Sequence, residues 1–492
     1  MSEARTQTRI AVFIALAVGL GLLWRPLLSM HQGLWGPADP WNNGDFLGAR
    51  WLFWAVAQSG DPTQMLHYPW GEDSILSNFP NPFDAWLFGP LVTDIKLPIW
   101  WNAMTLGHHL LNISATVFLA RATGARTLHA AAAGVLVAAS PIMLHEHTLG
   151  HTLTAAVWPG LFGLAALVRG RGVLAGLWIG IQGLAYLYAG LAFGLLALLI
   201  RPSRGLMSAF VIIAPYLFLL FPQFSVASAA TPPDGYTSLP LDGLLWLSQQ
   251  PQVRLHPLLL VGFLAPALGA STHRRYRRRI ALGALILLVL AFGPSVFGQR
   301  GDPALFDSPF KWLFTIPGLS RMHHPIRLGM IVTPLLAVCA ALAMHRKRSF
   351  WVLLAILSAL PTWKTIDNTG SWPESATPPG HDAALWLRNH ASAVVDLGSR
   401  SSEALALQPI HGKPVLSGLH PRNNPRAGLD AKLFRRVNAW AEGIPQPGLP
   451  AQLKHLGFTH ILVVDRSPHS PVNSSAVETA LGKPVYPGVY KL

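Results

Sequence analysis

Charged residues are scarce in this chain of 492 residues, of which 12% are Asp, Glu, Lys or Arg while 51% are hydrophobic. Soluble domains carry about twice that share of charge, so the composition excludes an ordinary soluble globular protein. The sequence instead predicts a polytopic membrane protein whose fold is mainly α-helical.

Cysteine is almost absent, because the chain has a single one, Cys339, inside an apolar run. No intramolecular disulfide can therefore form. Carboxylates are also few, with 22 Asp and Glu against 37 Lys and Arg, which gives a formal net charge of +15. In a soluble domain that excess would indicate nucleic acid, but here the arginines lie in short clusters between apolar runs. Membrane topology explains this pattern better, so we expect a lipid bilayer as partner and no nucleic acid.

No cleavage site of small residues follows the first apolar run, residues 10–28, so we interpret this run as a retained signal anchor. Arg5 and Arg9 precede it, which places the N-terminus inside by the positive-inside rule. Further spans are predicted near residues 98–120, 128–144, 152–168, 206–222, 255–270, 280–296, 326–344 and 350–363.

The longest apolar run, residues 173–200, decides the topology. As one helix it would place the later basic clusters outside, against the positive-inside rule. We therefore predict a break within QGLAYLYAG that leaves two legs of about 13 residues each, either short spans or a re-entrant unit. The chain then makes about eleven crossings or half-crossings, with the basic clusters inside and the acids outside, except Glu3.

Two long regions lie outside under this topology, the first loop at residues 29–97 and the C-terminal tail. The tail alternates polar helix-like segments such as HDAALWLRNH with apolar runs such as AVVDLG and THILVVDR, which is typical of a small α/β domain. We predict a transmembrane domain at 1–365, a linker at 366–380 and an extracytoplasmic α/β domain at 381–492. The chain has no internal repeat of the kind that marks rocker-type transporters.

One outer loop, HEHTLGH, is dense in side chains that can bind metal ions: His145, Glu146, His147 and His151. It is not a zinc-protease signature, because position 149, where that signature needs histidine, is Leu. On a helix, His147 and His151 would share one face, as a metal-binding pair would. The alternative is that these polar residues at the end of a span are merely solvated.

The first outer loop carries two candidate catalytic acids, Asp39 and Asp45, in GPADPWNNGDFLGARW. Asp45 follows a turn-forming NNG and precedes residues that could begin a helix on the membrane surface. Such a helix would hold the carboxylate at the lipid boundary, although Asp45 could equally be its cap. We expect Asp45 and the HEHTLGH loop to face one another across a cavity in the outer leaflet.

A basic group lies on the outer side, against the general trend, in LSRMHHPIR: Arg321, His323, His324 and Arg327. Cations at this place suit a phosphate group, while the alternative is simple interfacial anchoring, with Arg327 reaching out from the helix end. At the break in the 173–200 run, Tyr186 and Tyr188 are more typical of an aromatic belt than of the lining of a binding groove.

Several of these stretches resemble the GT-C superfamily of polytopic membrane glycosyltransferases. NGDFLGARWLFWAVAQ with YPWGED, SPIMLHEHTLGHTLTAAVWPGLFGL and LSRMHHPIRLGMIV carry the resemblance over most of residues 1–365, and HGKPVLSGLHPRNNP resembles the outer domain of such proteins. The resemblance implies a bacterial cytoplasmic-membrane enzyme that transfers a sugar, with inversion, from a polyprenyl-phosphate or polyprenyl-diphosphate carrier to a glycan, lipid or protein acceptor.

The same resemblance assigns roles to individual residues. Asp45 matches the first-loop acid, which acts as base on the acceptor or binds a divalent metal ion. HEH at 145–147 occupies the place of an acid-x-acid motif. Its histidines suit zinc or manganese better than magnesium, and the alternative is that the motif binds no metal ion.

Two other classes of protein remain open. A transporter or flippase would place ionisable residues within the spans, yet here His108 and His109 are the main exceptions in otherwise apolar spans. A non-enzymatic scaffold or degenerate transferase would tolerate loss of the outer acids.

Overall fold

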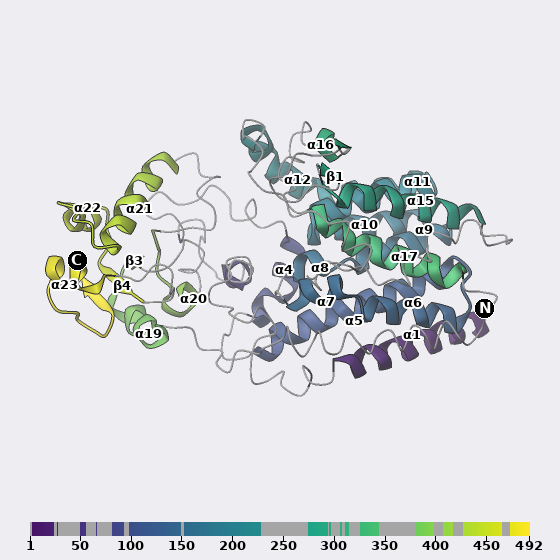
Figure 1. The fold of residues 1–492 in the computed structure, drawn as a ribbon, viewed down its shortest axis with the longest axis horizontal. Helices are drawn as coiled ribbons and strands as arrows, with labels where there is room; N and C mark the ends of the chain where they lie inside the picture. The colour runs from purple at the N-terminus through teal and green to yellow at the C-terminus, as the bar shows by residue number, and fades with distance from the viewer. Residues whose placement is uncertain are drawn as a thin grey trace. The chain divides into compact units, whose positions relative to one another are not determined.

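The computed structural model describes residues 2–23, 27, 50–55, 65, 81–92, 98–148, 152–227, 274–293, 295–296, 306–307, 310–313, 325–343, 380–397, 407–416, 427–464 and 473–492. The chain forms two compact units, Met1–Ser29 with Asn102–Ser371 and Met30–Trp101 with Trp372–Leu492. Most described residues are helical (Figure 1).

The first unit is a bundle of helices with one short antiparallel strand pair, β1 (Ser295–Val296) and β2 (Phe306–Asp307). Its helices are α1 (Ser2–Leu22), most of α5 (Pro98–Ala122), α6 (Thr127–Ala138), α7 (Pro141–Thr148), α8 (Thr152–Ala155), α9 (Trp158–Val168), α10 (Gly172–Ala185), α11 (Leu187–Ile200), η4 (Arg204–Met207), α12 (Ser208–Ala227), α15 (Arg274–Ala291), α16 (Phe310–Leu313), η7 (Pro325–Leu328) and α17 (Gly329–Ala343).

Within the described ranges, two helices are long and apolar enough to cross a membrane, Glu3–Leu22 and Pro325–Ala343. The pair Thr127–Ala138 and Pro141–His147, bent by 51°, makes a third candidate. The expected spans at 255–270 and 350–363 lie outside the described residues. The polar start of the chain, expected to precede the first span, is part of α1.

Prolines interrupt two of the predicted spans, because proline lacks an N–H and its ring collides with the carbonyl four residues earlier. The predicted span 128–144 is divided into α6 and α7 just before Pro141. The predicted span 152–168 is divided into α8 and α9 at Ala156 and Val157, just before Pro159. Each of these two predicted spans is therefore made of two shorter helices.

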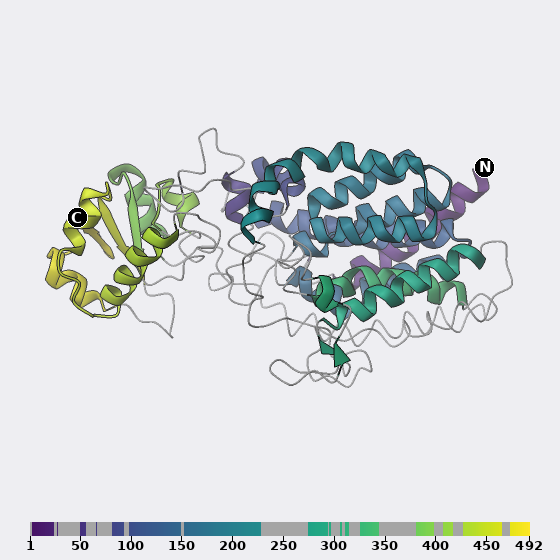
Figure 2. The same ribbon diagram turned by 90° about the horizontal axis from the view of Figure 1, so that it is seen from above.

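The predicted break in the 173–200 run is confirmed, because Tyr186 has extended backbone (φ −156°, ψ 108°) between two 14-residue helices, α10 and α11. The two legs form a hairpin. A Cβ on Gly172, where α10 begins, would lie 2.3 Å from the Oγ of Ser203, just after α11 ends. The start of α10 thus lies beside the end of α11, and Figure 2 shows helices of the first unit lying side by side.

Glycines along α10 let α12 approach closely. A Cβ on Gly176 would lie 2.2 Å from Ser208 Oγ, and one on Gly180 would lie 2.7 Å from Ile212 Cβ and 3.0 Å from the Ala209 carbonyl oxygen. Small residues spaced by four on one helix face are a common device for packing membrane helices, since they bring the backbones together.

We expect Gly180→Ala to destabilise the full-length chain by about 1–3 kcal/mol, because the new methyl group overlaps a packed backbone. The melting temperature in detergent measures this. Gly194→Ala on α11 is the matched control, since a Cβ there meets nothing within 4 Å and the change favours helix. Equal melting temperatures for the two variants would contradict the close packing of α10 on α12.

The second unit contains a three-stranded sheet of order β3-β4-β5. β3 (Val394–Leu397) runs parallel to β4 (His460–Val463), which is antiparallel to β5 (Val489–Lys491). Its helices are α4 (Pro82–Val92), α19 (His381–His390), α20 (Gln408–His411), α21 (Ala427–Ala441), α22 (Leu449–His455) and α23 (Ser474–Leu481). Alternate strand residues join two apolar clusters, Val395 and Ile461 in one and Val394 and Leu462 in the other.

Residues of the first loop belong to this second unit. The Met65 carbonyl oxygen accepts hydrogen bonds from Val415 N (3.0 Å) and from Gln408 Nε2 (2.6 Å). Trp51, fully buried, donates its indole N–H to Gln408 Oε1 (2.6 Å). The compact units therefore group the first loop with the tail, whereas the domain bounds 1–365, 366–380 and 381–492 stay predictions.

Candidate functional site

Two candidate residues, Glu146 on α7 and Arg327 on η7, form an ion pair in the first unit. Glu146 Oε2 lies 3.8 Å from Arg327 Nε, and the two side chains are 10% and 17% exposed. The sequence placed them in different roles, as metal ligand and as phosphate-binding cation. Arg327, which is partly exposed, thus pairs with a carboxylate from another helix of the bundle.

Thr154 on α8 supplies a second partner to the same carboxylate. Its Oγ1 donates a hydrogen bond of 2.6 Å to Glu146 Oε2. A buried charge is costly unless it is both paired and hydrogen-bonded, and this carboxylate has at least one partner of each kind. The two contacts link α7, α8 and η7 beside Glu146.

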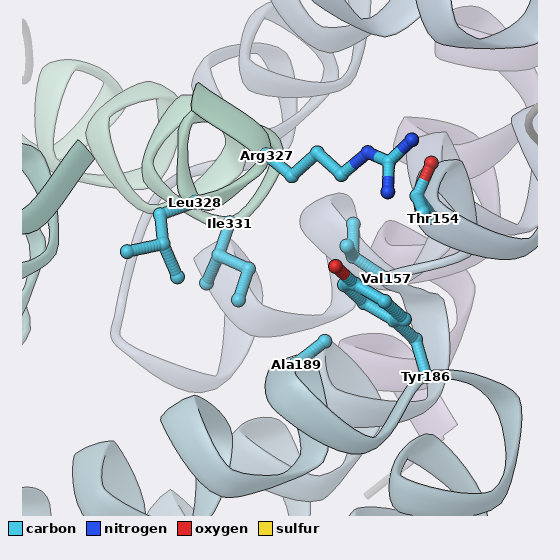
Figure 3. Close-up of a pocket in the computed structure, with 7 residues that line it drawn as sticks. All are labelled: Thr154, Val157, Tyr186, Ala189, Arg327, Leu328 and Ile331. Atoms are coloured by element: carbon cyan, nitrogen blue, oxygen red, sulfur yellow. The ribbon is translucent and has the colours of Figure 1, made fainter. Parts of the chain in front are cut away.

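A small cavity, too narrow in this structure to admit a water molecule, adjoins the pair and is lined by Thr154, Val157, Tyr186, Ala189, Arg327, Leu328 and Ile331 (Figure 3). The polar side chains are a guanidinium, a phenol and a hydroxyl, and the others are aliphatic. In Figure 3 the Arg327 guanidinium is directed toward Thr154, while Leu328 and Ile331 lie on the side away from Thr154. The cavity therefore combines a cationic, hydrogen-bonding part with an apolar part.

Tyr186 was interpreted as a belt aromatic, and this was wrong. It is 8% exposed, lines the cavity and interacts with the Arg327 guanidinium. Its backbone is extended at the break between α10 and α11, so its side chain does not follow the helical spacing of its neighbours and lines the cavity instead. Tyr188 packs against it with ring centroids 5.7 Å apart.

The break between α8 and α9 is held by two buried amide side chains. Asn112 on α5 donates through Nδ2 to the Ala155 carbonyl oxygen (2.7 Å) and accepts through Oδ1 from Val157 N (3.0 Å). Gln182 on α10 donates through Nε2 to the Ala156 carbonyl oxygen (2.9 Å) and accepts through Oε1 from Gly160 N (3.1 Å). Each unpaired backbone group buried there would cost about 1–3 kcal/mol, so these contacts permit non-helical backbone inside the bundle.

Histidines form a second polar group nearby in the sequence. His147, fully buried, packs edge-to-face on His109 with ring centroids 5.1 Å apart. His108 accepts through Nδ1 from the Trp158 indole N–H (2.9 Å), which requires its proton on Nε2 if the ring is neutral. His145 is half-buried. The His147 ring thus packs inside the bundle, beside α5.

The described residues do not by themselves fit a metal centre. Among them, no three His, Cys, Asp or Glu side chains gather closely enough to hold an ion. Glu146 is engaged with Thr154 and Arg327. The other candidates, Asp39, Asp45, His151, Arg321, His323 and His324, lie outside the described residues, and their roles stay predictions.

The sequence analysis missed Thr154, Asn112 and Gln182. A signal for the amides was present, because an Asn at 112 and a Gln at 182 inside predicted spans are costly without polar partners. Pro159 within another predicted span was the matching signal for a break that needs such partners.

Similarity to known proteins is confined to the fold. No family model matches the sequence, and none of the curated proteins is similar to it. The fold resembles a cryo-EM structure of arabinofuranosyltransferase AftD from mycobacteria, with 17% identity, a TM-score of 0.55 and coverage of 93% of this chain and 35% of AftD. A structure of an AftD mutant gives 16% identity, a TM-score of 0.56 and coverage of 93% and 36%.

The chain thus spans about a third of the length of the AftD structures it matches. At this level of identity the likeness is one of fold alone, and the fold that the chain shares with these structures is mainly helical.

Proposed function

We propose that this chain is a membrane glycosyltransferase that moves a sugar from a polyprenyl-phosphate or polyprenyl-diphosphate carrier to an acceptor on the extracytoplasmic side. The observation that carries the proposal is the cavity in which Arg327, held by Glu146, adjoins both hydroxyl groups and aliphatic side chains. The GT-C-like fold supports it.

The polar part of the cavity suits the phosphate of the donor. A guanidinium presents several N–H groups in a plane and can bind two phosphate oxygens at once. The hydroxyl group of Tyr186 can donate to a further oxygen, whereas the Thr154 hydroxyl already donates its proton to Glu146. Because negative charge develops on the departing phosphate as the glycosidic bond breaks, Arg327 would stabilise the transition state more than the bound donor.

The apolar part of the cavity suits the lipid that carries the sugar. Val157, Ala189, Leu328 and Ile331 offer an aliphatic wall beside the guanidinium. A polyprenyl phosphate matches this arrangement, because its anionic phosphate is followed directly by apolar isoprene units. Glu146 keeps Arg327 in place before the donor arrives and shares the guanidinium with the phosphate afterwards.

The acceptor side of the reaction is proposed to use a first-loop acid. Inverting transfer needs a carboxylate that removes the acceptor's proton as its oxygen attacks the sugar, and we assign this to Asp45, with Asp39 as the second candidate. A divalent ion, Mn, Mg or Zn, at His145, Glu146, His147 and His151 stays a prediction. No step is assigned to it.

The proposed placement is the bacterial cytoplasmic membrane, with the N-terminus inside, about eleven crossings, and the α/β domain of the tail outside. The acceptor would then be a glycan, lipid or protein of the cell envelope.

The proposal is tested with the purified full-length chain in lipid vesicles and radiolabelled polyprenyl-phosphate sugars. We expect label to pass to an acceptor, and free polyprenyl phosphate to inhibit as a product. Binding of polyprenyl phosphate without any transfer would favour the alternative of a degenerate transferase. Net movement of the intact lipid-linked sugar across the vesicle membrane would favour a flippase.

A further inference from the structure

At the interruption at Ala156 and Val157, side-chain hydrogen bonds from other helices replace the backbone hydrogen bonds of a continuous helix. In an unbroken helix the Ala155 carbonyl would accept from residue 159, but Pro159 has no N–H to give. Asn112 Nδ2 takes the place of that missing donor at 2.7 Å. The Asn112 side chain thus compensates for the proline from a different helix.

Gln182 replaces the next backbone hydrogen bond of the helix, the one between residues 156 and 160. The Ala156 carbonyl and the Gly160 N–H would bond to one another in a continuous helix. Instead the carbonyl accepts from Gln182 Nε2 at 2.9 Å, and the N–H donates to Gln182 Oε1 at 3.1 Å. An amide fits between them because it carries a donor and an acceptor on the same group.

Gln182 also belongs to the second break that shapes the cavity. Its backbone carbonyl accepts the N–H of Tyr186 at 2.8 Å, the bond with which α10 ends. The side chain of Gln182 therefore holds the break that presents Thr154 and Val157, while its carbonyl lies at the break that presents Tyr186. Both breaks contribute walls to one cavity.

We infer that Asn112 and Gln182 are positioning residues of the proposed transferase, which hold the α8–α9 break so that Thr154 meets Glu146 and the cavity beside Arg327 keeps its shape. This inference rests on the proposed function. Neither amide lines the cavity, so each acts through the backbone of residues 155–160 and then through Thr154. Misplacing a reacting group by about 1 Å costs on the order of a hundredfold in rate.

A purely structural role for Asn112 can be distinguished from a positioning role with a second substitution. That substitution gives residue 159 a backbone N–H, which can bond to the Ala155 carbonyl in place of Asn112. Asn112→Leu in the full-length chain should lower the melting temperature and kcat, because it removes both bonds of the amide and leaves the Ala155 carbonyl only its contact with Val157 N at 3.1 Å. Adding Pro159→Ala returns an N–H to that carbonyl, so the double variant should recover the melting temperature. Its helix then runs straight through the break, so kcat should stay at least about tenfold below wild type.

Pro159→Ala alone keeps every partner and should fold even if Asn112→Leu does not. We expect it to be at least as stable as wild type and to keep kcat within about twofold, because Asn112 and Gln182 still hold the break. Thr123→Val is the matched control, because Thr123 is a buried polar residue directly after α5 whose hydroxyl bonds to carbonyls of that helix, Leu119 and Ala120. It should leave kcat within about twofold of wild type. Recovery of kcat together with the melting temperature in the double variant would overturn the positioning role.

Hydrogen exchange tests the inference without the lipid-linked sugar substrate. The amides of Val157 and Gly160 should exchange faster in Asn112→Leu and Gln182→Met respectively, and at the wild-type rate in Thr123→Val. Unchanged exchange at both amides overturns the inference whether or not the wild type is active. A wild-type chain with no transfer and no binding of polyprenyl phosphate instead overturns the proposed function.

Discussion

An Arg327→Gln variant is expected to transfer sugar about 10²- to 10³-fold more slowly than the wild-type chain. Glutamine keeps a hydrogen-bond donor near the cavity but loses the positive charge and the planar pair of N–H groups. Removal of one preplaced donor to developing negative charge costs about that much in other enzymes. The measurement is kcat at saturating polyprenyl-phosphate sugar, together with the affinity for free polyprenyl phosphate.

Loss of Arg327 also leaves the Glu146 carboxylate without its ion-pair partner, which would destabilise the fold on its own. The double variant Glu146→Gln with Arg327→Gln removes this complication. Its melting temperature should exceed that of Arg327→Gln, because no buried charge remains unpaired, while its transfer rate should remain low. A melting temperature that recovers together with the transfer rate would mean that the ion pair is structural and that the phosphate binds elsewhere.

Arg201→Gln is the control for a general effect of arginine. Arg201 is exposed, follows α11 and has no carboxylate partner among the described residues. Its replacement should leave kcat unchanged within about twofold, since it takes no part in the cavity.

The sequence predicted the elements that depend on local physics. The break at Tyr186 could be found because the positive-inside rule forbids a single helix through residues 173–200. The strands β3 and β4 and the helix α19 coincide with the quoted runs AVVDLG, THILVVDR and HDAALWLRNH, whose spacing of apolar residues is a local property.

What depends on contacts distant in the chain could not be predicted in the same way. Glu146 and Arg327 were each identified as candidates, but their ion pair joins helices far apart in the sequence. The same holds for Trp51 and Gln408, which are 357 positions apart and link the first loop to the tail. Thr154 carries no distinctive pattern, because a threonine in an apolar run is ordinary until a carboxylate lies beside it.

Asp45→Asn is the second change with a large expected effect, and it is expected to abolish transfer while the chain still folds. General base catalysis contributes about 10²- to 10⁴-fold, and asparagine cannot accept the acceptor's proton. Asparagine keeps the size of the side chain and caps helices about as well as aspartate, so a helix that begins after residue 45 would survive the change. Loss of transfer at an unchanged melting temperature would thus speak for the charge and against the capping role.

Asp84→Asn provides the comparison within the same loop region. Asp84 is fully buried in α4 and accepts a hydrogen bond from Asn81 Nδ2 at 2.7 Å, so its carboxylate already has a local structural partner. We expect this change to lower the melting temperature and to leave the rate per folded molecule within about twofold of wild type. If Asp45→Asn behaved in the same way, with lowered stability and normal transfer, Asp45 would be a structural acid and the base would have to be sought at Asp39. If Asp45→Asn alone lost transfer, the acid of the first loop and the guanidinium of Arg327 would be assigned to the two ends of one reaction, proton removal from the acceptor and charge stabilisation on the carrier.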